Sequence, residues 1–320
     1  MKLASGCTYL VTGVTGQDGF YSARRFLRKG ARVIGVSRQS LARAKPHVRL
    51  LARHRNFQFV SMPEYTIGHV RDLIGFVKPD RIVHAAGFRD IPSNESEVAQ
   101  CYFTNCDLAG MLLQAVADLV PRARFLFISS AEIFGKTHGT ALDESTPRSP
   151  ENDYAVSKVQ GMEQVEDFRT GRNIFGVSAI CFNHDSFLSP ERHLVSLVPR
   201  KLLRFKADMG SVLKFYNTDM RRDWSHAKDF ARAFDLMLEH NSPTDFVVAS
   251  GRSTSLREYI DLTCDLLRIE SRDFLVFENR ADEDTYDRIA CADRIHRQLG
   301  WTPQVTLRQL CREMIRCSRQ

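Results

Sequence analysis

Short apolar runs alternate with amphipathic stretches along the first half of the chain. Strand-like composition occupies residues 9–11, 32–37, 57–60, 81–85 and 124–129. Helix-like composition lies between these runs, at residues 20–29, 70–78 and 98–119. Consecutive parallel strands need a crossover connection, which is usually a helix. The alternation therefore predicts an α/β fold with a doubly wound parallel sheet of the Rossmann type.

The pattern becomes less regular after the first half of the chain. Amphipathic helices are predicted at residues 195–205, 256–267 and 307–315, and they would form a smaller α/β lobe at the C-terminus. A segment near 226–250 is expected to return to the sheet. We therefore expect a Rossmann domain over residues 1–182, completed by that segment, and a smaller lobe formed mainly by residues 183–320.

Three glycines interrupt the chain directly after its first strand. Gly13, Gly16 and Gly19 stand between an apolar run and a stretch of helical composition that ends before Gly30. Glycine lets the backbone approach a pyrophosphate closely, and the start of a helix offers free N–H groups and the positive end of its dipole. Strand, glycine turn and helix in this order predict a dinucleotide phosphate site.

The end of the second strand bears on which dinucleotide binds there. Sites that prefer NAD usually place an acidic residue at this position, on the ribose 2′-hydroxyl. Here the strand ends in Ser37-Arg38-Gln39-Ser40. A cation and hydroxyl groups suit a 2′-phosphate, so we expect NADP, with Arg38 on that phosphate. The alternative is that Arg38 is an ordinary surface arginine.

Polar side chains follow the fifth strand, at the carboxyl edge where an open α/β sheet binds its ligands. Ser130 and Glu132 stand at this strand end, and Tyr154 and Lys158 follow a proline-rich loop. A tyrosine and a lysine four residues apart lie on one face of a helix. The lysine ammonium can lower the pKa of the phenol, and a serine hydroxyl can share the substrate oxygen. The set predicts proton transfer by a tyrosinate base.

Composition and charge narrow the class of ligand and the compartment. The chain has 320 residues, of which 43% are hydrophobic and 26% charged, and no apolar stretch is long enough to span a bilayer. A formal charge of +7 is spread along the chain without a basic arm, which favours an anionic small ligand over nucleic acid. Eight cysteines without a CxxC pair predict buried thiols in a reducing, cytoplasmic compartment and no metal site.

Longer motifs give the chain a specific resemblance. They are the glycine turn 13–19, Arg148-Ser149-Pro150, Phe182-Asn183-His184-Asp185-Ser186, residues 222–229 and residues 245–251. On these motifs, which run nearly end to end, the chain resembles the extended short-chain dehydrogenase/reductases and, among them, the GDP-mannose 4,6-dehydratase family. The resemblance implies an NADP-dependent lyase that converts GDP-mannose to GDP-4-keto-6-deoxymannose by internal hydride transfer. It implies a catalytic set of Ser130, Glu132, Tyr154 and Lys158.

The resemblance also extends the two sets of binding residues. Expected contacts of the cofactor are Gly13, Thr15, Gly16, Gln17, Asp18, Gly19, Arg38, Ala85, Ala86, Tyr154 and Lys158. Expected contacts of the nucleotide sugar are Arg89, Asn183, Lys201, Arg222, Arg280 and Glu283. Arg222 and Arg280 are candidate clamps of the diphosphate, because a planar guanidinium matches phosphate oxygens. The family also implies a homodimer or homotetramer, for which the helices expected at 98–119 and 154–169 are the candidate interface.

Several positions depart from the family pattern. The acidic residue and leucine that usually follow the third strand are replaced by Met62-Pro63, and a polar pair after the fourth strand by Phe88-Arg89. The loop 187–192 is longer than usual, and Arg280 lacks the proline that usually follows it. A reductase of the keto sugar, a 4-epimerase and a dehydratase of another GDP-sugar therefore stay open as alternatives. A non-catalytic NADP-binding regulator would not need a tyrosine that transfers protons.

Overall fold

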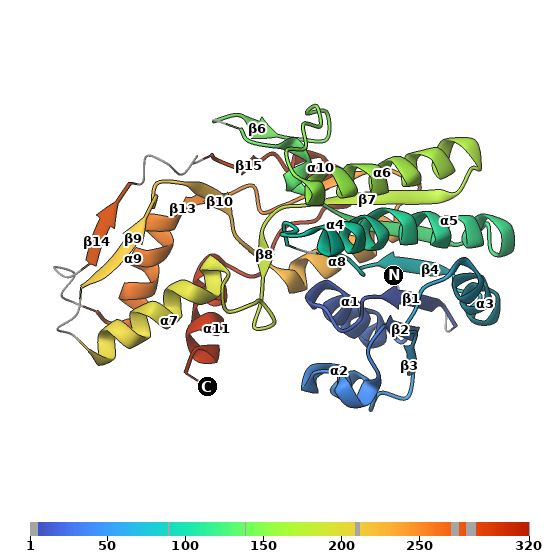
Figure 1. Cartoon of the computed structure of the whole chain (residues 1–320), viewed down its shortest axis with the longest axis horizontal. Helices are drawn as coiled ribbons and strands as arrows, with labels where there is room; N and C mark the ends of the chain where they lie inside the picture. The colour runs from blue at the N-terminus through green and yellow to red at the C-terminus, as the bar shows by residue number, and fades with distance from the viewer. Residues whose placement is uncertain are drawn as a thin grey trace.

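The computed structural model describes residues 6–88, 90–137, 139–208, 212–269, 275–279 and 286–319. A large domain built on one sheet lies beside a smaller lobe of helices and short strands (Figure 1). The strands of the main sheet are β1 (Thr8–Thr12), β2 (Arg32–Ser37), β3 (Phe57–Ser61), β4 (Arg81–His84), β5 (Arg124–Ser130), β7 (Phe175–Cys181) and β12 (Phe246–Val248). These seven strands are all parallel, in the order β12-β7-β5-β4-β1-β2-β3.

The strand order reverses at one place in the sheet. From β1 the chain moves outward through β2 to β3, and it then returns to β4 on the other side of β1. From β4 it moves outward in the opposite direction to β5, β7 and β12. This order is that of a doubly wound sheet, so the predicted fold class is confirmed. Such a reversal leaves a crevice beside the carboxyl ends of the two central strands.

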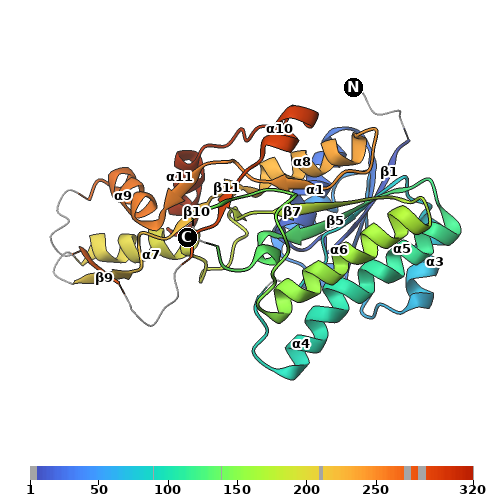
Figure 2. The same cartoon turned by 90° about the horizontal axis from the view of Figure 1, so that it is seen from above.

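Helices cover both faces of the sheet (Figure 2). One face carries α1 (Gln17–Arg28), α8 (Ala227–Glu239) and α10 (Asp293–Leu299). The other face carries α3 (Ile67–Val77), α5 (Leu108–Leu119) and α6 (Asp153–Gly171). The core between the layers contains fully buried aromatic rings such as Phe26, Phe127 and Phe230. Within the described ranges, no helix has the length and apolarity needed to cross a bilayer.

The helix expected over 98–119 begins earlier, at Glu95, and is not a continuous α-helix. The structure divides it into α4 (Glu95–Tyr102), a π-helical turn η2 (Phe103–Asp107) and α5. A π-turn accommodates an additional residue within the helix, and such turns are frequent at functional sites. Asn105 lies in this turn and is completely buried. A hydrophobic period of 3.6 residues carries no sign of such a turn, so the sequence analysis missed it.

The smaller lobe has its own hydrophobic core. Its helices are α7 (Leu194–Ala207), α9 (Leu256–Leu267) and α11 (Leu307–Cys317). Its strands pair two by two, β9 (Leu213–Tyr216) with β14 (Leu275–Glu278) and β10 (Arg221–Asp223) with β13 (Ser253–Ser255). Trp224 and Tyr259 pack edge to face in this core, with ring centroids 4.7 Å apart. The lobe is therefore an α/β unit that packs around its own aromatic residues.

Two short strand pairs join segments that are far apart in the sequence. β8 (His184–Asp185) pairs with β11 (Ser225–His226), and β6 (Ala141–Leu142) pairs with β15 (Ile289–Ala290). β8 lies between the large domain and the lobe (Figure 1). Two short elements, η1 (Leu41–Arg43) and α2 (Pro46–Leu51), follow β2, and η3 (Ala131–Phe134) follows β5. The chain thus crosses between the two parts close to the carboxyl ends of the sheet strands.

Candidate active site

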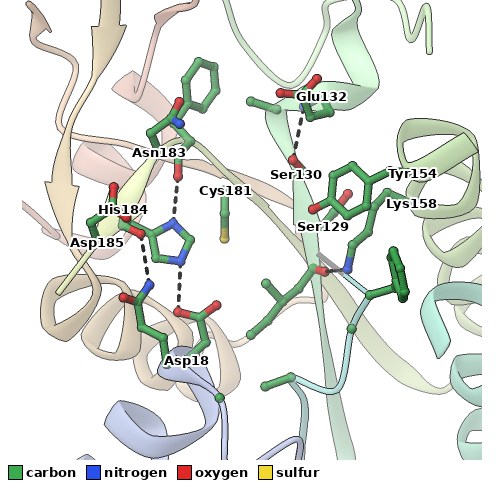
Figure 3. Close-up of a pocket in the computed structure, with 18 of the residues that line it drawn as sticks. Asp18, Ser129, Ser130, Glu132, Tyr154, Lys158, Cys181, Asn183, His184 and Asp185 are labelled. Atoms are coloured by element: carbon green, nitrogen blue, oxygen red, sulfur yellow. Dashed lines mark hydrogen bonds and ion pairs between the residues drawn. The ribbon is translucent and has the colours of Figure 1, made fainter. Parts of the chain in front are cut away.

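A pocket opens at the carboxyl edge of the sheet, beside the point where the strand order reverses (Figure 3). Residues from the ends of β4 and β5 and from the start of α6 line one side of it. Residues that follow β7 line the opposite side, and the start of α1 lies between the two. Among the described residues, no group of three or more His, Cys, Asp and Glu side chains is arranged to hold a metal ion.

Two of the three glycines in the turn after β1 are required by close backbone contacts. Gly13 has a φ of +65°, and a Cβ there would lie 2.5 Å from the backbone nitrogen of Ala86. A Cβ on Gly19 would lie 2.3 Å from the carbonyl oxygen of Gly13. Gly16 is the N-cap of α1, which has no side-chain cap. The first N–H groups of α1 have no partner within the helix, as a phosphate-binding turn requires.

Gln17 and Asp18 at the start of α1 hold the segment that follows β7. Gln17 donates from Nε2 to the carbonyl oxygen of His184 at 2.9 Å, and its Oε1 accepts from the hydroxyl groups of Ser186 and Ser189. Asp18 Oδ1 lies 2.9 Å from Nε2 of His184. Burial opposes a charge on His184, but the Asp18 carboxylate outweighs burial and raises the pKa of His184. The cofactor contacts predicted for Gln17 and Asp18 stay predictions.

A second hollow adjoins the turn at the end of β2. Arg38 is exposed beside it, and the hydroxyl oxygens of Thr15 and Ser37 lie 3.3 Å apart within it. Tyr65 and Phe103 add aromatic side chains to its lining. Tyr65 is nearly buried, which raises its pKa to about 12. No sequence signal pointed to Tyr65, although it lies beyond β3 where the usual acidic residue is missing.

The predicted catalytic residues Ser130, Tyr154 and Lys158 all line the main pocket. Asn152 caps α6, because its side chain accepts a hydrogen bond from the backbone N–H of Ala155. This cap fixes the start of the helix at Asp153, directly before Tyr154. Ser130 is the last residue of β5, and its hydroxyl accepts from the backbone N–H of Glu132 at 3.2 Å. Strand end and helix start thus meet at the same edge of the sheet (Figure 3).

Lys158 lies on the inner face of α6. Its Nζ donates to the carbonyl oxygen of Ile128 at 2.8 Å, and it lies 5.0 Å from the ring centroid of Phe127 and 5.9 Å from that of Tyr154. Burial lowers the pKa of Lys158 to about 8. Tyr154 and Lys158 thus lie on one face of α6, as their four-residue spacing predicted. The ammonium is desolvated next to the tyrosine, so its attraction for an anion is stronger than it would be in water.

Asn105 is a site residue that the sequence analysis missed. Its Nδ2 donates to the carbonyl oxygen of Phe88 at 3.2 Å and to the hydroxyl of Ser157 at 3.0 Å. Its Oδ1 accepts from the backbone N–H of Phe88 at 3.0 Å. A Cβ on Gly87 would lie 3.2 Å from this Oδ1 and 3.3 Å from Nζ of Lys158. Asn105 therefore ties the chain after β4 to α6, directly beside the buried lysine.

Glu132 forms an ion pair with a residue that no motif singled out. Both guanidinium Nη atoms of Arg288 donate to its carboxylate, with Nη2 2.7 Å from Oε2 and Nη1 in closer contact with Oε1. The Arg288 side chain is 4% exposed and that of Glu132 is 27% exposed. Burial opposes the charge of Arg288, but Glu132 outweighs burial and raises the pKa of the arginine above its ordinary value.

The residues predicted to bind the nucleotide sugar are not all brought together. Asn183 lines the pocket (Figure 3). Arg222 instead donates to the carbonyl oxygen of Tyr286 and lies 4.7 Å from the centroid of its ring. Lys201 lies on α7, 5.8 Å from the ring centroid of Phe215. The remaining three lie outside the described residues: Arg89, Arg280 and Glu283.

The chain matches known proteins over nearly its full length. A family model described as GDP-mannose 4,6 dehydratase matches residues 10–314. The human GDP-mannose 4,6 dehydratase is 30% identical over 344 residues, which cover 96% of this chain and 90% of the human protein. The GDP-mannose 4,6 dehydratase 2 of Caenorhabditis elegans is 28% identical, over 96% of this chain and 87% of the nematode protein.

Solved structures share the fold at lower sequence identity. The dTDP-glucose 4,6-dehydratase of Bacillus anthracis, in complex with NAD, gives a TM-score of 0.83 at 20% identity over 98% of this chain and 96% of its own. RMD from Pseudomonas aeruginosa, complexed with NADPH, gives 0.76 at 23% identity over 98% of both chains. With the family model matching from β1 to α11, this chain belongs to the GDP-mannose 4,6 dehydratase family, as its motifs predicted.

Proposed function

We propose that this chain is a GDP-mannose 4,6-dehydratase, which converts GDP-mannose to GDP-4-keto-6-deoxymannose with bound NADP. In this proposal residues 1–182 hold the cofactor and residues 183–320 mainly hold the nucleotide sugar. Membership of the family supports the reaction class. The observation that carries the proposal is that the main pocket presents Glu132 together with Ser130, Tyr154 and Lys158. A dehydratase needs proton transfer at O4 and a separate acid or base for C5 and C6, and this set provides both.

The residues around the glycine turn fit a nicotinamide dinucleotide. Gly13 and Gly19 bring backbone atoms into close contact, and the uncapped start of α1 suits a pyrophosphate. Arg38 beside the second hollow supports a 2′-phosphate, and hence NADP. Two solved proteins of the same fold hold NAD and NADPH. When bound, the nicotinamide would accept a hydride from the sugar and later give it back.

The first proton transfer involves Tyr154. The ammonium of Lys158 would stabilise a phenolate on Tyr154, which takes the proton from O4 as C4 becomes a ketone. Ser130 holds O4 by a hydrogen bond and then holds the enolate oxygen that develops there. Asn105 keeps the backbone beside Lys158 in place throughout. Tyr154 and Ser130 act on O4 of the sugar, and none of these four residues acts on C5.

The second proton transfer involves Glu132. A ketone at C4 makes the hydrogen on C5 acidic, so a carboxylate can remove it. The C5–H bond breaks and the proton moves to Glu132. The bond between C6 and its hydroxyl oxygen then breaks, while Glu132 returns a proton to that oxygen, which leaves as water. The hydride removed from C4 is restored at C6, and a proton from solvent is added at C5, which balances the proton that Tyr154 took from O4. The sugar therefore loses one water and undergoes no net oxidation.

Incubation of the purified protein with GDP-mannose and catalytic NADP, followed by mass spectrometry, tests the proposal. We expect the sugar to lose one water while the amount of NADPH stays unchanged. Glu132→Gln should stop the elimination and still permit partial hydride transfer from C4. Unchanged GDP-mannose, together with NADPH-dependent reduction of the keto sugar, would identify a reductase instead. Faster turnover with NAD than with NADP would contradict the role given to Arg38.

We further propose that the protein is a cytoplasmic homodimer, of which two could form a tetramer. The helices α5 and α6 lie side by side on one face of the sheet (Figure 2). They keep partly buried apolar residues, among them Met111, Val159 and Phe168. Two copies would cover these helices in a four-helix interface. All eight cysteines are free thiols, which supports a reducing compartment.

A further inference from the structure

The ion pair between Glu132 and Arg288 joins two positions that are 156 residues apart in the sequence. Both carboxylate oxygens of Glu132 accept from Arg288, which is the geometry that a guanidinium and a carboxylate adopt when they bind most strongly. Both residues line the main pocket with Ser130 and Tyr154. The arginine is therefore in direct contact with the residue to which the proposed function assigns the elimination.

The backbone fixes where Arg288 lies. The N–H of Asp287 donates to the carbonyl oxygen of Thr137 at 3.1 Å, and the N–H of Arg288 donates to that of Arg221 at 3.1 Å. The next residues form β15, which pairs with β6 in the loop that follows Glu132. The segment that carries Arg288 is thus bound on both sides, to the loop after Glu132 and to β10. Its guanidinium is held at the carboxylate by the fold.

A structural role alone gives a poor account of this pair. Burying two charges costs desolvation energy, and a buried ion pair is often no more stabilising than apolar residues of similar volume. Arg288 is almost fully buried, and among the described residues its Nε has no hydrogen-bond partner. An arginine with an unsatisfied nitrogen is a costly choice for packing. Its placement against a pocket carboxylate therefore calls for a role in the chemistry.

We propose that Arg288 is a positioning residue for Glu132, which it keeps ionised and oriented toward the sugar in the elimination step. This proposal rests on the proposed function. Glu132 must be a carboxylate to remove the proton from C5, and the pair with Arg288 favours that form. While Glu132 carries the proton, Arg288 lacks its anionic partner, so the pair also favours release of the proton to the leaving oxygen of C6. Through Glu132, Arg288 thus acts on both proton movements, the removal from C5 and the delivery to the oxygen of C6.

Other charged and titratable groups surround the pair of Glu132 and Arg288 and come from the elements packed around it. Tyr286 and Asp287 come from the same segment as Arg288, Arg222 comes from β10, and Tyr154 comes from α6. Arg222 donates to backbone carbonyl oxygens of its own strand and of Tyr286. Asp287 accepts from the backbone N–H of Arg221 at 2.8 Å. The direct ion pair of Glu132 among the described residues is with Arg288, so its removal changes the charge next to the carboxylate most.

Steady-state kinetics with GDP-mannose test the proposal in the active enzyme. Arg288→Gln should lower kcat on the order of tenfold or more, with KM changed by about twofold or less, because the sugar still binds while Glu132 is poorly held. The acidic limb of the pH profile of kcat should move to higher pH. Arg288→Lys, which keeps the charge but not the two-pronged contact, should restore part of the rate. An unchanged kcat and pH profile would overturn the proposal.

Arg294 offers a matched control. It also forms an ion pair with a glutamate, with its Nε 3.4 Å from Oε2 of Glu144, and it lies only six residues beyond Arg288. This pair is outside the main pocket. Arg294→Gln should therefore leave the pH profile of kcat unchanged. If it moved the acidic limb as far as Arg288→Gln does, the effect would come from general loosening of the segment, and the proposal would fall.

A measurement without substrate separates this proposal from the proposed function. Carbodiimide with an amine labels accessible carboxyl groups, and peptide mass spectrometry locates the label. Glu132 should react faster in Arg288→Gln than in the wild type, while the exposed Glu95 should react equally in both. Equal labelling of Glu132 in the wild type and in Arg288→Gln would show that Arg288 does not hold Glu132, even if the protein is an active dehydratase. If Glu132 of the wild type is protected from labelling but the protein leaves GDP-mannose unchanged, the proposed function is refuted, while the contact by which Arg288 holds Glu132 stands.

Discussion

Replacing Lys158 by methionine is expected to stabilise the cofactor-free protein at pH 7, although it removes a residue that we place in the catalytic set. The lysine is 5% exposed, and burial lowers its pKa from 10.5 to about 8. The unfolded chain therefore binds this proton more tightly than the folded chain does. Holding the charge costs free energy of folding at every pH below about 8. Methionine has a similar length and carries no charge.

The size of the effect follows from the two pKa values and one hydrogen bond. At about 1.4 kcal/mol for each pH unit between 10.5 and about 8, the cost of the buried ammonium is about 3 kcal/mol. Methionine also loses the hydrogen bond to the carbonyl oxygen of Ile128, which is worth about 1 kcal/mol. The variant should therefore be more stable by about 2 kcal/mol at pH 7. The cost of the ammonium disappears as the pH rises to 10.5, so the variant should then be less stable by about 1 kcal/mol.

Urea unfolding at several pH values measures this difference, because effects common to both proteins cancel. Lys158→Met and the wild type are compared at pH 7 and near pH 10.5, without added nucleotide. Lys228→Met is the control, since Lys228 is exposed on α8 and its replacement should give a difference that does not depend on pH. A free-energy difference for Lys158→Met that is the same at both pH values would refute the argument from desolvation.

Two further predictions concern the glycine turn and the assembly. Gly19→Ala should destabilise the fold by about 1–3 kcal/mol and abolish NADPH binding in a fluorescence titration, because its Cβ would lie 2.3 Å from the carbonyl oxygen of Gly13. In Gly16→Ala the new Cβ would lie 3.3 Å from the carbonyl oxygen of Gly13, so this control variant should keep its fold. If Gly19→Ala bound NADPH as tightly as the wild type, the assignment of this turn to the cofactor would be contradicted. Light scattering should show a dimer at micromolar concentration, and a monomer there would exclude the interface proposed for α5 and α6.

Features encoded by local sequence were predicted well. The second strand and the helix at 256–267 have the predicted bounds, because each is set by a short run of apolar positions with clear ends. Ser255 and Glu258 even form a capping box at the start of that helix. Tyr154 and Lys158 share the helix face that their spacing requires. The order of elements also predicted which strand ends would meet, since parallel strands expose their carboxyl ends at one edge.

Features that depend on distant pairing were not predictable in this way. The contact of Arg288 with Glu132 exists because β15 pairs with β6, and no short pattern reports such a pairing. The buried position of Asn105 depends on a π-turn that hydrophobic periodicity does not reveal. Arg222 has the composition of a phosphate ligand, yet its contacts are with a tyrosine from another part of the chain. In each case a partner far along the sequence decides what the side chain does.

The hydrogen bonds of Gln17 and Asp18 constrain how this protein can be engineered. The two residues stand in the turn that follows β1, yet their side chains hold His184, Ser186 and Ser189 on the other side of the pocket. Transplanting a turn from another dehydrogenase would remove these partners and leave buried polar groups unsatisfied. Exchange of the turn would therefore disturb the opposite wall of the pocket, which follows β7. The turn and residues 184–189 must be exchanged together, as one module.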